Sequence, residues 1–250
     1  MMDNIERDKI LKKSKHIIEL GLVKTHRKGD TGIGKTFEDL MGVSENNLPG
    51  CDLHGYEIKS QRINSASYIT LFTKSPTHPR GINAILRDKF GTPYDDNPSL
   101  KRLHTSMFAN SYNTYKGEYS FKLIHEPLEE KIYIGVFKNT NKELLDKTAY
   151  YTYKEFQKIF DTKLKRLFLV LAESIKIDKI EHFKYKDIYL YYNPSISEFL
   201  KLIDQGLIMY DIRIGVYRSG KNIGKSHDHG SGFRIKRENI HKLYKNFIKA

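Results

Sequence analysis

The segment Cys51–Lys59, CDLHGYEIK, decides how the fold of this chain is interpreted. From Tyr56 its composition is that of a strand, on which successive side chains point to opposite faces. Glu57 and Lys59 would therefore share one face, whereas Tyr56 and Ile58 would point to the other. The segment predicts a strand that presents an acid and a base together.

An additional acid, Asp52, precedes this strand closely enough to share a metal ion with Glu57. Hard divalent cations such as Mg²⁺ prefer oxygen ligands. Phosphodiester hydrolysis uses such a cation to polarise the phosphoryl oxygen and to bind the attacking water, and Lys59 could stabilise the developing charge. The same residue types also occur by chance in basic proteins, as a surface Glu–Lys pair on an exposed strand. The pattern by itself leaves both interpretations open.

A second motif, GDTGIGKT at Gly29–Thr36, satisfies the phosphate-binding pattern G-x-x-x-x-G-K-[ST]. In that interpretation Lys35 would reach the outer phosphates and Thr36 would hold Mg²⁺. Such a loop follows a buried apolar strand, but residues 24–28 read KTHRK. The run LFLVLAE at Leu167–Glu173 resembles the acid-tipped strand of ATPases, yet it also fits a central strand of any sheet. Nucleotide binding therefore stays an alternative, and we expect another role for the glycines.

The charge balance points to a polyanionic partner. The 250 residues include 43 Lys and Arg against 30 Asp and Glu, which gives a formal net charge of +13. With 39% hydrophobic residues, and with 17 Tyr and 13 Phe among the basic groups, the chain is expected to be globular and to bind nucleic acid. A basic surface that is merely solvated is the alternative.

The single cysteine, Cys51, excludes an intrachain disulfide, and the N-terminal segment lacks the apolar core of a signal peptide. No apolar run approaches the roughly 20 residues that span a bilayer. We therefore expect a cytoplasmic protein, of bacterial type, that has no membrane span.

Hydrophobic periodicity predicts a mixed α/β fold. Helices are expected at about 4–20, 36–41, 153–164 and 195–205 and from about 237, and strands at 56–60, 67–73, 121–125, 131–138, 166–173, 212–216 and 232–235. The strands at 56–60 and 67–73 are expected to be neighbours in one sheet. Residues 76–117, rich in Pro, Gly and Asn, are expected to form a long, partly irregular surface loop.

Several blocks, in one order along most of the chain, resemble the MutH-related branch of the PD-(D/E)xK nucleases, and within it the MvaI/BcnI-like type II restriction endonucleases. The blocks are Gly29–Glu38, Asp52, Glu57–Ser60, Thr70–Pro76, Pro79–Gly81, Asp211–Gly215, Tyr217, Ser219–Lys221, Gly224–Lys225, His227–Gly230 and Phe233–Ile235. Cys51 stands where the family name expects Pro, but only the following Asp is chemically required.

The resemblance implies a catalytic role for each residue of the acidic segment. Asp52 and Glu57 would hold Mg²⁺, and the carbonyl of Ile58 would complete its coordination. Lys59 would orient or activate the attacking water. Glu38 matches an additional acid on the helix that follows the glycines. The glycines would then let the backbone turn tightly and start this helix near the metal.

The basic loop at residues 218–229 is the candidate for base recognition. Arginine and histidine can donate hydrogen bonds to guanine, and aspartate can accept one from cytosine N4, so the mixture suits a site rich in G·C pairs. The resemblance nominates a set of residues that would contact base edges: Arg213, His227, Asp228, His229 and Arg234. Lys35 and Lys74 are candidates for contacts with DNA phosphates. Zinc binding by His227 and His229 lacks cysteine partners and a spaced second pair. A simple surface loop is the other alternative.

Taken together, these features predict a Mg²⁺-dependent endonuclease of restriction type that leaves 5′-phosphate and 3′-hydroxyl ends in double-stranded DNA. Residues 1–90 are expected to form mainly the catalytic lobe and residues 91–250 the remainder, with the DNA-recognition lobe. By resemblance we expect a monomer, a target of CCWGG or CCSGG, and a DNA methyltransferase as a functional but not physical partner. The alternatives are a MutH-like mismatch-repair nickase, a DNA-binding module without catalysis, and a protein that binds a nucleoside triphosphate.

Overall fold

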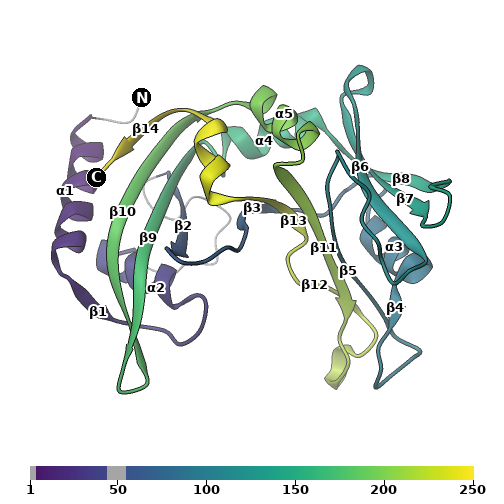
Figure 1. Ribbon diagram of the computed structural model, residues 1–250, viewed down its shortest axis with the longest axis horizontal. Coiled ribbons are helices and arrows are strands. Elements are labelled where there is room, and N and C mark those ends of the chain that lie inside the picture. The colour runs from purple at the N-terminus through teal and green to yellow at the C-terminus, as the bar shows by residue number, and fades with distance from the viewer. Residues whose placement is uncertain (1–3, 44–54) are drawn as a thin grey trace. The chain divides into compact units, whose positions relative to one another are not determined.

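The strand expected from CDLHGYEIK forms in the computed structural model as β2 (Glu57–Arg62), at one end of a five-stranded sheet (Figure 1). The structure describes residues 4–43 and 55–250. β2 pairs in parallel with β9 (Arg166–Ile177), whereas the other pairs of this sheet are antiparallel. Residues 167–172 of β9 are buried, which confirms the prediction of a central strand there.

The first unit of the chain completes this sheet with three further strands and adds two helices. Its other elements are α1 (Asn4–Glu19), β1 (Leu22–Lys24), α2 (Gly32–Met41), β10 (Ile180–Pro194) and β14 (Tyr244–Lys249). The core contains Ile10 and Ile17 of α1, Phe37 of α2 and Phe168 of β9. The two predicted helices are therefore confirmed, and their apolar faces pack onto the sheet.

The second unit contains a six-stranded sheet and a three-stranded antiparallel sheet. The larger sheet is built from β3 (Ile69–Thr73), β4 (Thr92–Pro93), β5 (Lys101–Met107), β11 (Ile208–Val216), β12 (Ser226–Asp228) and β13 (Gly232–Ile235). The smaller one is built from β6 (Tyr119–Glu126), β7 (Lys131–Lys138) and β8 (Leu144–Thr152), with the short helix η1 (Pro127–Glu129) closing the predicted hairpin. The remaining elements are α3 (Ile82–Phe90), α4 (Tyr153–Asp161), α5 (Ile196–Asp204), η2 (Gly220–Asn222) and η3 (Arg237–Lys242).

Three expectations about these elements were wrong. β2 and β3 are not neighbours, because β2 pairs with β9 and β3 pairs with β13 in a different sheet. Residues 76–117 include α3, β4 and β5 rather than one long irregular loop. The C-terminal segment forms only the 3₁₀ helix η3 before it joins β10 as strand β14.

The two units are each assembled from separate segments of the chain. One comprises residues 1–69, 159–195 and 240–250, and the other comprises residues 70–158 and 196–239. The units therefore interleave along the sequence, whereas the expected lobes were consecutive. The mixed α/β class is confirmed. Within the described residues, no helix has the length and apolar character needed to span a membrane.

Candidate functional site

Glu57 and Lys59 form a nearly buried acid–base pair at the start of β2. Lys59 Nζ donates to Glu57 Oε1 at 2.6 Å, and the two side chains are 19% and 5% exposed. Ile58 points to the other face and packs in the core of the first unit. The predicted alternation is therefore confirmed, and the interpretation as a solvated surface pair is wrong.

A second ammonium group, which the sequence did not predict, reaches the same carboxylate oxygen. Lys163 Nζ lies 3.4 Å from Glu57 Oε1. Lys163 lies in the short connection between α4 and β9, and the parallel pairing of β9 with β2 brings it to Glu57. A buried carboxylate that faces two ammonium groups is a strongly polar site inside an apolar sheet. No local pattern could reveal it, because the partners are far apart in the sequence.

The glycines of GDTGIGKT serve close packing of α2 against β2. A Cβ added to Gly34 would lie 2.8 Å from Ser60 Oγ, and one added to Gly32 would lie 2.3 Å from the carbonyl oxygen of Arg27. The same Gly34 position lies 3.8 Å from Glu38 Oε1. The absence of a side chain at Gly34 therefore lets the helix that carries Glu38 approach the strand that carries Glu57, whereas Gly32 allows close approach to the preceding loop. That these glycines bring Glu38 near a metal ion stays a prediction.

The phosphate-loop alternative does not fit this geometry. Thr36 is fully buried, and its Oγ1 accepts the backbone N–H of His26 at 2.9 Å. Lys35 Nζ is 2.8 Å from Asp39 Oδ1 one turn along α2. The strand that enters the loop, β1, has only three residues and is partly exposed. The hydroxyl that would hold Mg²⁺ in a nucleotide site is therefore engaged within the fold.

Two of the predicted acids, Glu57 and Glu38, are described by the structure, and their carboxylate oxygens are ligands that suit a hard divalent cation. Glu57 lies on β2, and Glu38 lies on the helix packed against that strand. The predicted ligand Asp52 lies outside the described residues. Among the residues that are described, no group of three or more His, Cys, Asp or Glu side chains could hold a metal ion.

The second unit brings two of the predicted recognition residues to one buried acid. Asp211 Oδ2 lies 2.5 Å from Arg213 Nε and 2.9 Å from Arg234 Nε. The Arg213 contact is a hydrogen bond, whereas the N–H of Arg234 Nε is not directed at the oxygen, so that contact is a charge pair. Arg234 also donates to Thr70 Oγ1 and, at 3.1 Å, to the carbonyl of Gly230. Asp211 therefore orients Arg213 by a hydrogen bond and balances the charge of Arg234, which Thr70 and Gly230 orient.

The signal for Asp211 was present in the sequence. Asp211 and Arg213 are two residues apart on a strand, and such residues share a face. The pairing of β11 with β13 then brings Arg234 to the same place.

The predicted histidines lie in a row of stacked rings. The ring centroids of Tyr217 and His227 are 4.4 Å apart, and those of His227 and His229 are 4.2 Å apart. His104 of β5 meets His229 edge-on at 5.8 Å. These rings line a cavity of about 660 Å³ together with Tyr94, Asp96, Arg102, Val216, Arg218 and Ser219. Partial burial, followed by the charges of His229, Arg102 and Arg213, lowers the pKa of His104 below its ordinary value.

Asp228 uses its acceptor capacity inside the protein. Its Oδ1 accepts the N–H groups of Gly230 and Ser231 at 2.9 and 2.6 Å. Its Oδ2 accepts from Ser75 at 2.7 Å and from Asn83 at 3.1 Å. A carboxylate has about four acceptor sites, and four donors take them here. This geometry makes Asp228 a residue that holds the loop between His227 and Arg234.

The predicted phosphate contacts are both partly engaged within the fold. Lys74 Nζ lies 3.4 Å from Glu155 Oε1, and its backbone N–H donates to the carbonyl of Ser231 at 2.9 Å. Lys74 is thereby adjacent to the loop that Asp228 holds. Lys35 lies on α2 of the first unit and pairs with Asp39.

Comparison with known proteins supports the same interpretation. No curated protein matches the chain significantly. Among solved structures, a restriction endonuclease MvaI–cognate DNA substrate complex matches with a TM-score of 0.87, and restriction endonuclease MvaI in the absence of DNA matches with 0.67. Both are 33% identical to this chain and cover 100% of it, and the match covers 99% and 98% of their own chains.

The family match extends over nearly the whole chain. Residues 11–244 match the MvaI/BcnI restriction endonuclease family. This range contains Glu57 and Lys59 as well as Asp211 and the two arginines that contact it. The chain therefore belongs to the MvaI/BcnI restriction endonuclease family and is a site-specific deoxyribonuclease.

Proposed function

We propose that this enzyme is a Mg²⁺-dependent, type II restriction endonuclease that cuts both strands of DNA and leaves 5′-phosphate and 3′-hydroxyl ends. The observation that carries the proposal is the buried Glu57 carboxylate, which faces Lys59 at 2.6 Å and Lys163 at 3.4 Å. Burying a carboxylate is costly unless it is paired, and here the mostly buried Lys59 and the 42% exposed Lys163 both face it. Such a set fits hydrolysis of a phosphodiester, whose transition state gains negative charge.

Each residue of the site has a separate role in this proposal. Asp52 and Glu57 hold Mg²⁺, with the carbonyl of Ile58 as a further ligand, and the bound ion supplies Lewis-acid polarisation of the phosphoryl group. Lys59 orients the attacking water and takes part in its deprotonation. Lys163 stabilises charge on the phosphate. Glu38, brought to β2 by the close packing of α2, contributes an additional acid.

Recognition of the sequence is assigned to the second unit. Arg213 and Arg234 present their guanidinium groups to guanine, and His227 and His229 donate to the same kind of acceptor. Asp228 holds their loop, while Lys74 and Lys35 contact phosphates. The target proposed from the family resemblance is CCWGG or CCSGG. The solved complex of MvaI with cognate DNA supports double-stranded DNA as the ligand.

The biological setting is proposed on the same resemblance. The enzyme acts as a monomer in the cytoplasm, within a restriction–modification system. A DNA methyltransferase that modifies the same sequence protects the host DNA without binding to the nuclease.

Plasmid cleavage with and without Mg²⁺, followed by sequencing of the ends, tests the proposal. We expect breaks in both strands at one sequence, which chelation of the metal abolishes. Nicks in one strand only would instead indicate a MutH-like nickase. Binding without cleavage would indicate a DNA-binding module, and cleavage that requires ATP would restore the phosphate-loop interpretation.

A further inference from the structure

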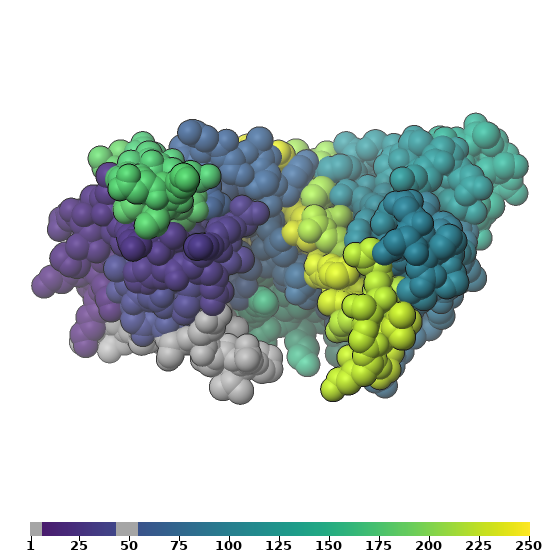
Figure 2. Space-filling view, turned by 90° about the horizontal axis from the view of Figure 1, so that it is seen from below, coloured from purple at the N-terminus to yellow at the C-terminus, as the bar shows by residue number. Residues whose placement is uncertain are grey.

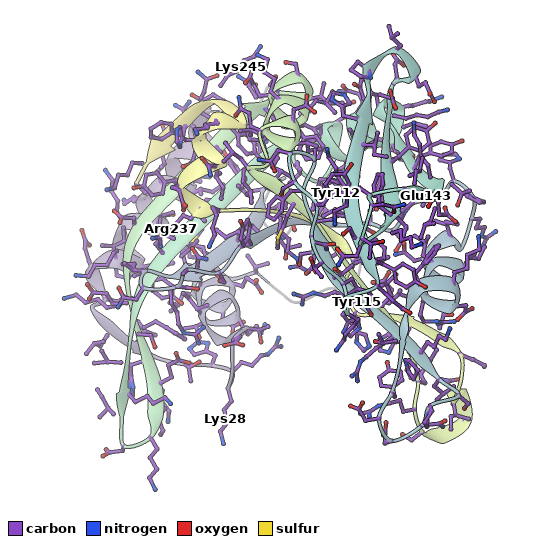
Figure 3. All side chains as sticks on the ribbon, turned by 45° about the vertical axis from the view of Figure 1, so that its right-hand side comes forward. Lys28, Tyr112, Tyr115, Glu143, Arg237 and Lys245 are labelled. Carbon is purple, nitrogen blue, oxygen red and sulfur yellow. The ribbon has the colours of Figure 1, made fainter. Side chains whose placement is uncertain are left out.

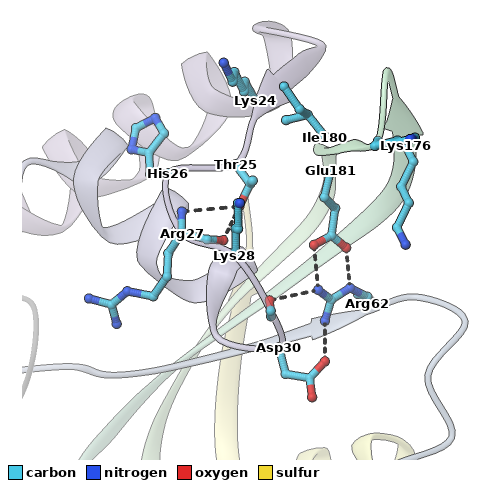
Figure 4. A pocket seen from close by; sticks show the side chains of 12 residues that line it. Lys24, Thr25, His26, Arg27, Lys28, Asp30, Arg62, Lys176, Ile180 and Glu181 are labelled. Carbon is cyan, nitrogen blue, oxygen red and sulfur yellow. Dashed lines mark hydrogen bonds and ion pairs between the residues drawn. The ribbon is translucent and has the colours of Figure 1, made fainter.

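The first unit contains a basic groove that the nuclease site does not use (Figure 4). It has a volume of about 900 Å³ and lies between residues 24–30 and the turn that connects β9 to β10. The space-filling view shows the green tip of this hairpin against the purple N-terminal segment (Figure 2), in agreement with the pairing of β1 and β10. Six cations line the groove: Lys24, Arg27, Lys28, Arg62, Lys176 and Lys179.

The groove is separate from the Glu57 site. Arg62 lines it from the far end of β2. Arg62 lies five positions after Glu57 on β2, which corresponds to a distance of roughly 17 Å at about 3.3 Å per residue. By the alternation of a strand, Arg62 also points to the opposite face from Glu57 and Lys59.

The loop that carries the first three cations is held at several points. The N–H of Thr25 donates to the carbonyl of Glu181 at 2.9 Å, and the Thr25 hydroxyl donates to the carbonyl of Arg27 at 2.6 Å. Further along, Arg62 donates to the carbonyl of Gly29 at 3.3 Å. The backbone beneath Arg27 and Lys28 is therefore preorganised, and Lys28 projects outward from it (Figure 3).

The two acids of the groove both lie close to Arg62, whose single positive charge offsets one of them. Arg62 forms a two-pronged pair with Glu181, at 2.8 and 2.9 Å, and lies 3.7 Å from Asp30. Within the described part of the chain, the ammonium groups of Lys28 and Lys179 make no ion pair. A concave surface lined by cations of this kind concentrates positive potential and draws in polyanions.

We infer that this groove binds the sugar–phosphate backbone of DNA that flanks the recognition sequence. The inference rests on the proposed endonuclease function. The separation of roughly 17 Å from Glu57 corresponds to about five base pairs at ~3.4 Å each. The groove is thus too far from Glu57 to touch the phosphate being cleaved, which leaves the backbone of the flanking DNA as the phosphates that its cations can bind.

Binding to two duplexes with the same central site tests this inference. One duplex has about two flanking base pairs on each side and the other about twelve, so that only the second passes the groove. Affinity is measured without Mg²⁺ over a series of salt concentrations, using the complete chain. The variant Lys28→Ala/Lys179→Ala removes two groove charges, and Lys12→Ala/Lys15→Ala removes two exposed charges from α1 as the matched control.

Each lost phosphate contact lowers the slope of log affinity against log salt by about 0.9. On the long duplex, we therefore expect the groove variant to have a slope that is smaller by about two units. The ratio of the affinities of the unmodified enzyme and the variant should then change by roughly ten-fold across a four-fold range of salt concentration. The gain from longer flanks should persist in the control variant.

Three results would overturn the inference. The unmodified enzyme could bind both duplexes with the same affinity, or the groove variant could lose affinity equally for both. The control variant could also lose as much of the affinity gained from longer flanks as the groove variant does. Cleavage of the long duplex with Mg²⁺ is scored separately, and its absence in the unmodified enzyme would reject the proposed function instead.

Discussion

Replacing Asp211 by Asn removes a negative charge that Arg213 and Arg234 share, while nearly preserving the shape of the side chain. The Asp211 side chain is 6% exposed and that of Arg234 is 12%, whereas that of Arg213 is 48%. A buried charge left without its partner costs about 3–5 kcal/mol, and an exposed pair contributes about 0–1 kcal/mol. The hydrogen bond from Ser106 Oγ to Oδ1, at 3.0 Å, can persist in the variant. We therefore expect a loss of about 3–4 kcal/mol in unfolding free energy, most of it through Arg234.

A double-mutant cycle separates the two arginines. Asp211→Asn is combined with Arg234→Met and, separately, with Arg213→Met, and unfolding by urea is followed by far-ultraviolet circular dichroism, because the chain has no Trp. The coupling energy should be about 2–3 kcal/mol with Arg234 and below about 1 kcal/mol with Arg213.

The comparison is valid only if the slope of unfolding free energy against urea stays constant among the variants. Equal couplings, or a larger coupling with Arg213, would refute the argument that burial decides the strength of these pairs. In that case Asp211 would act mainly through its hydrogen bond to Arg213 rather than through the buried charge of Arg234.

Glu57→Gln should abolish Mg²⁺-dependent cleavage while specific binding stays measurable, because a metal ligand is lost and the base readers remain; cleavage at the normal rate would reject Glu57 as a ligand. Lys163→Met should lower the single-turnover cleavage rate at least ten-fold, which corresponds to about 1.4 kcal/mol of activation free energy, and should change DNA binding less. Lys154→Met, on an exposed face of α4 in the second unit, serves as the control. Burial alone raises the pKa of Asp228, but hydrogen bonds from Ser231, Ser75 and Asn83 outweigh it and the pKa is lowered. The stability that Asp228 contributes is therefore fully present above its unfolded pKa of about 3.9 and is lost as the pH falls through the folded value. Asp228→Asn should accordingly be less stable than the unmodified chain at pH 7, by about 1–3 kcal/mol, and the difference should shrink below about pH 4; a constant difference would contradict this assignment.

The sequence by itself determined the local features of this protein. Alternation on one strand sufficed to place Glu57 and Lys59 on the same face, and helical periodicity sufficed for α1. Both depend only on residues a few positions apart, whose relation the backbone geometry dictates. The order of the resembling blocks added the family, which the match over residues 11–244 confirms.

Only the tertiary structure decided which distant groups meet. The composition of residues 76–117 predicted a surface loop, but two polar residues within them are buried. Asn83 donates to Asp228 at 3.1 Å, and Arg87 donates to the carbonyl of Gly215 at 2.9 Å. Likewise, Lys163 reaches Glu57 only because β9 pairs in parallel with β2. Such partners are chosen by strand pairing and by the need to satisfy buried polar groups. Periodicity records which face of an element is apolar, and it carries no information about which element packs against that face.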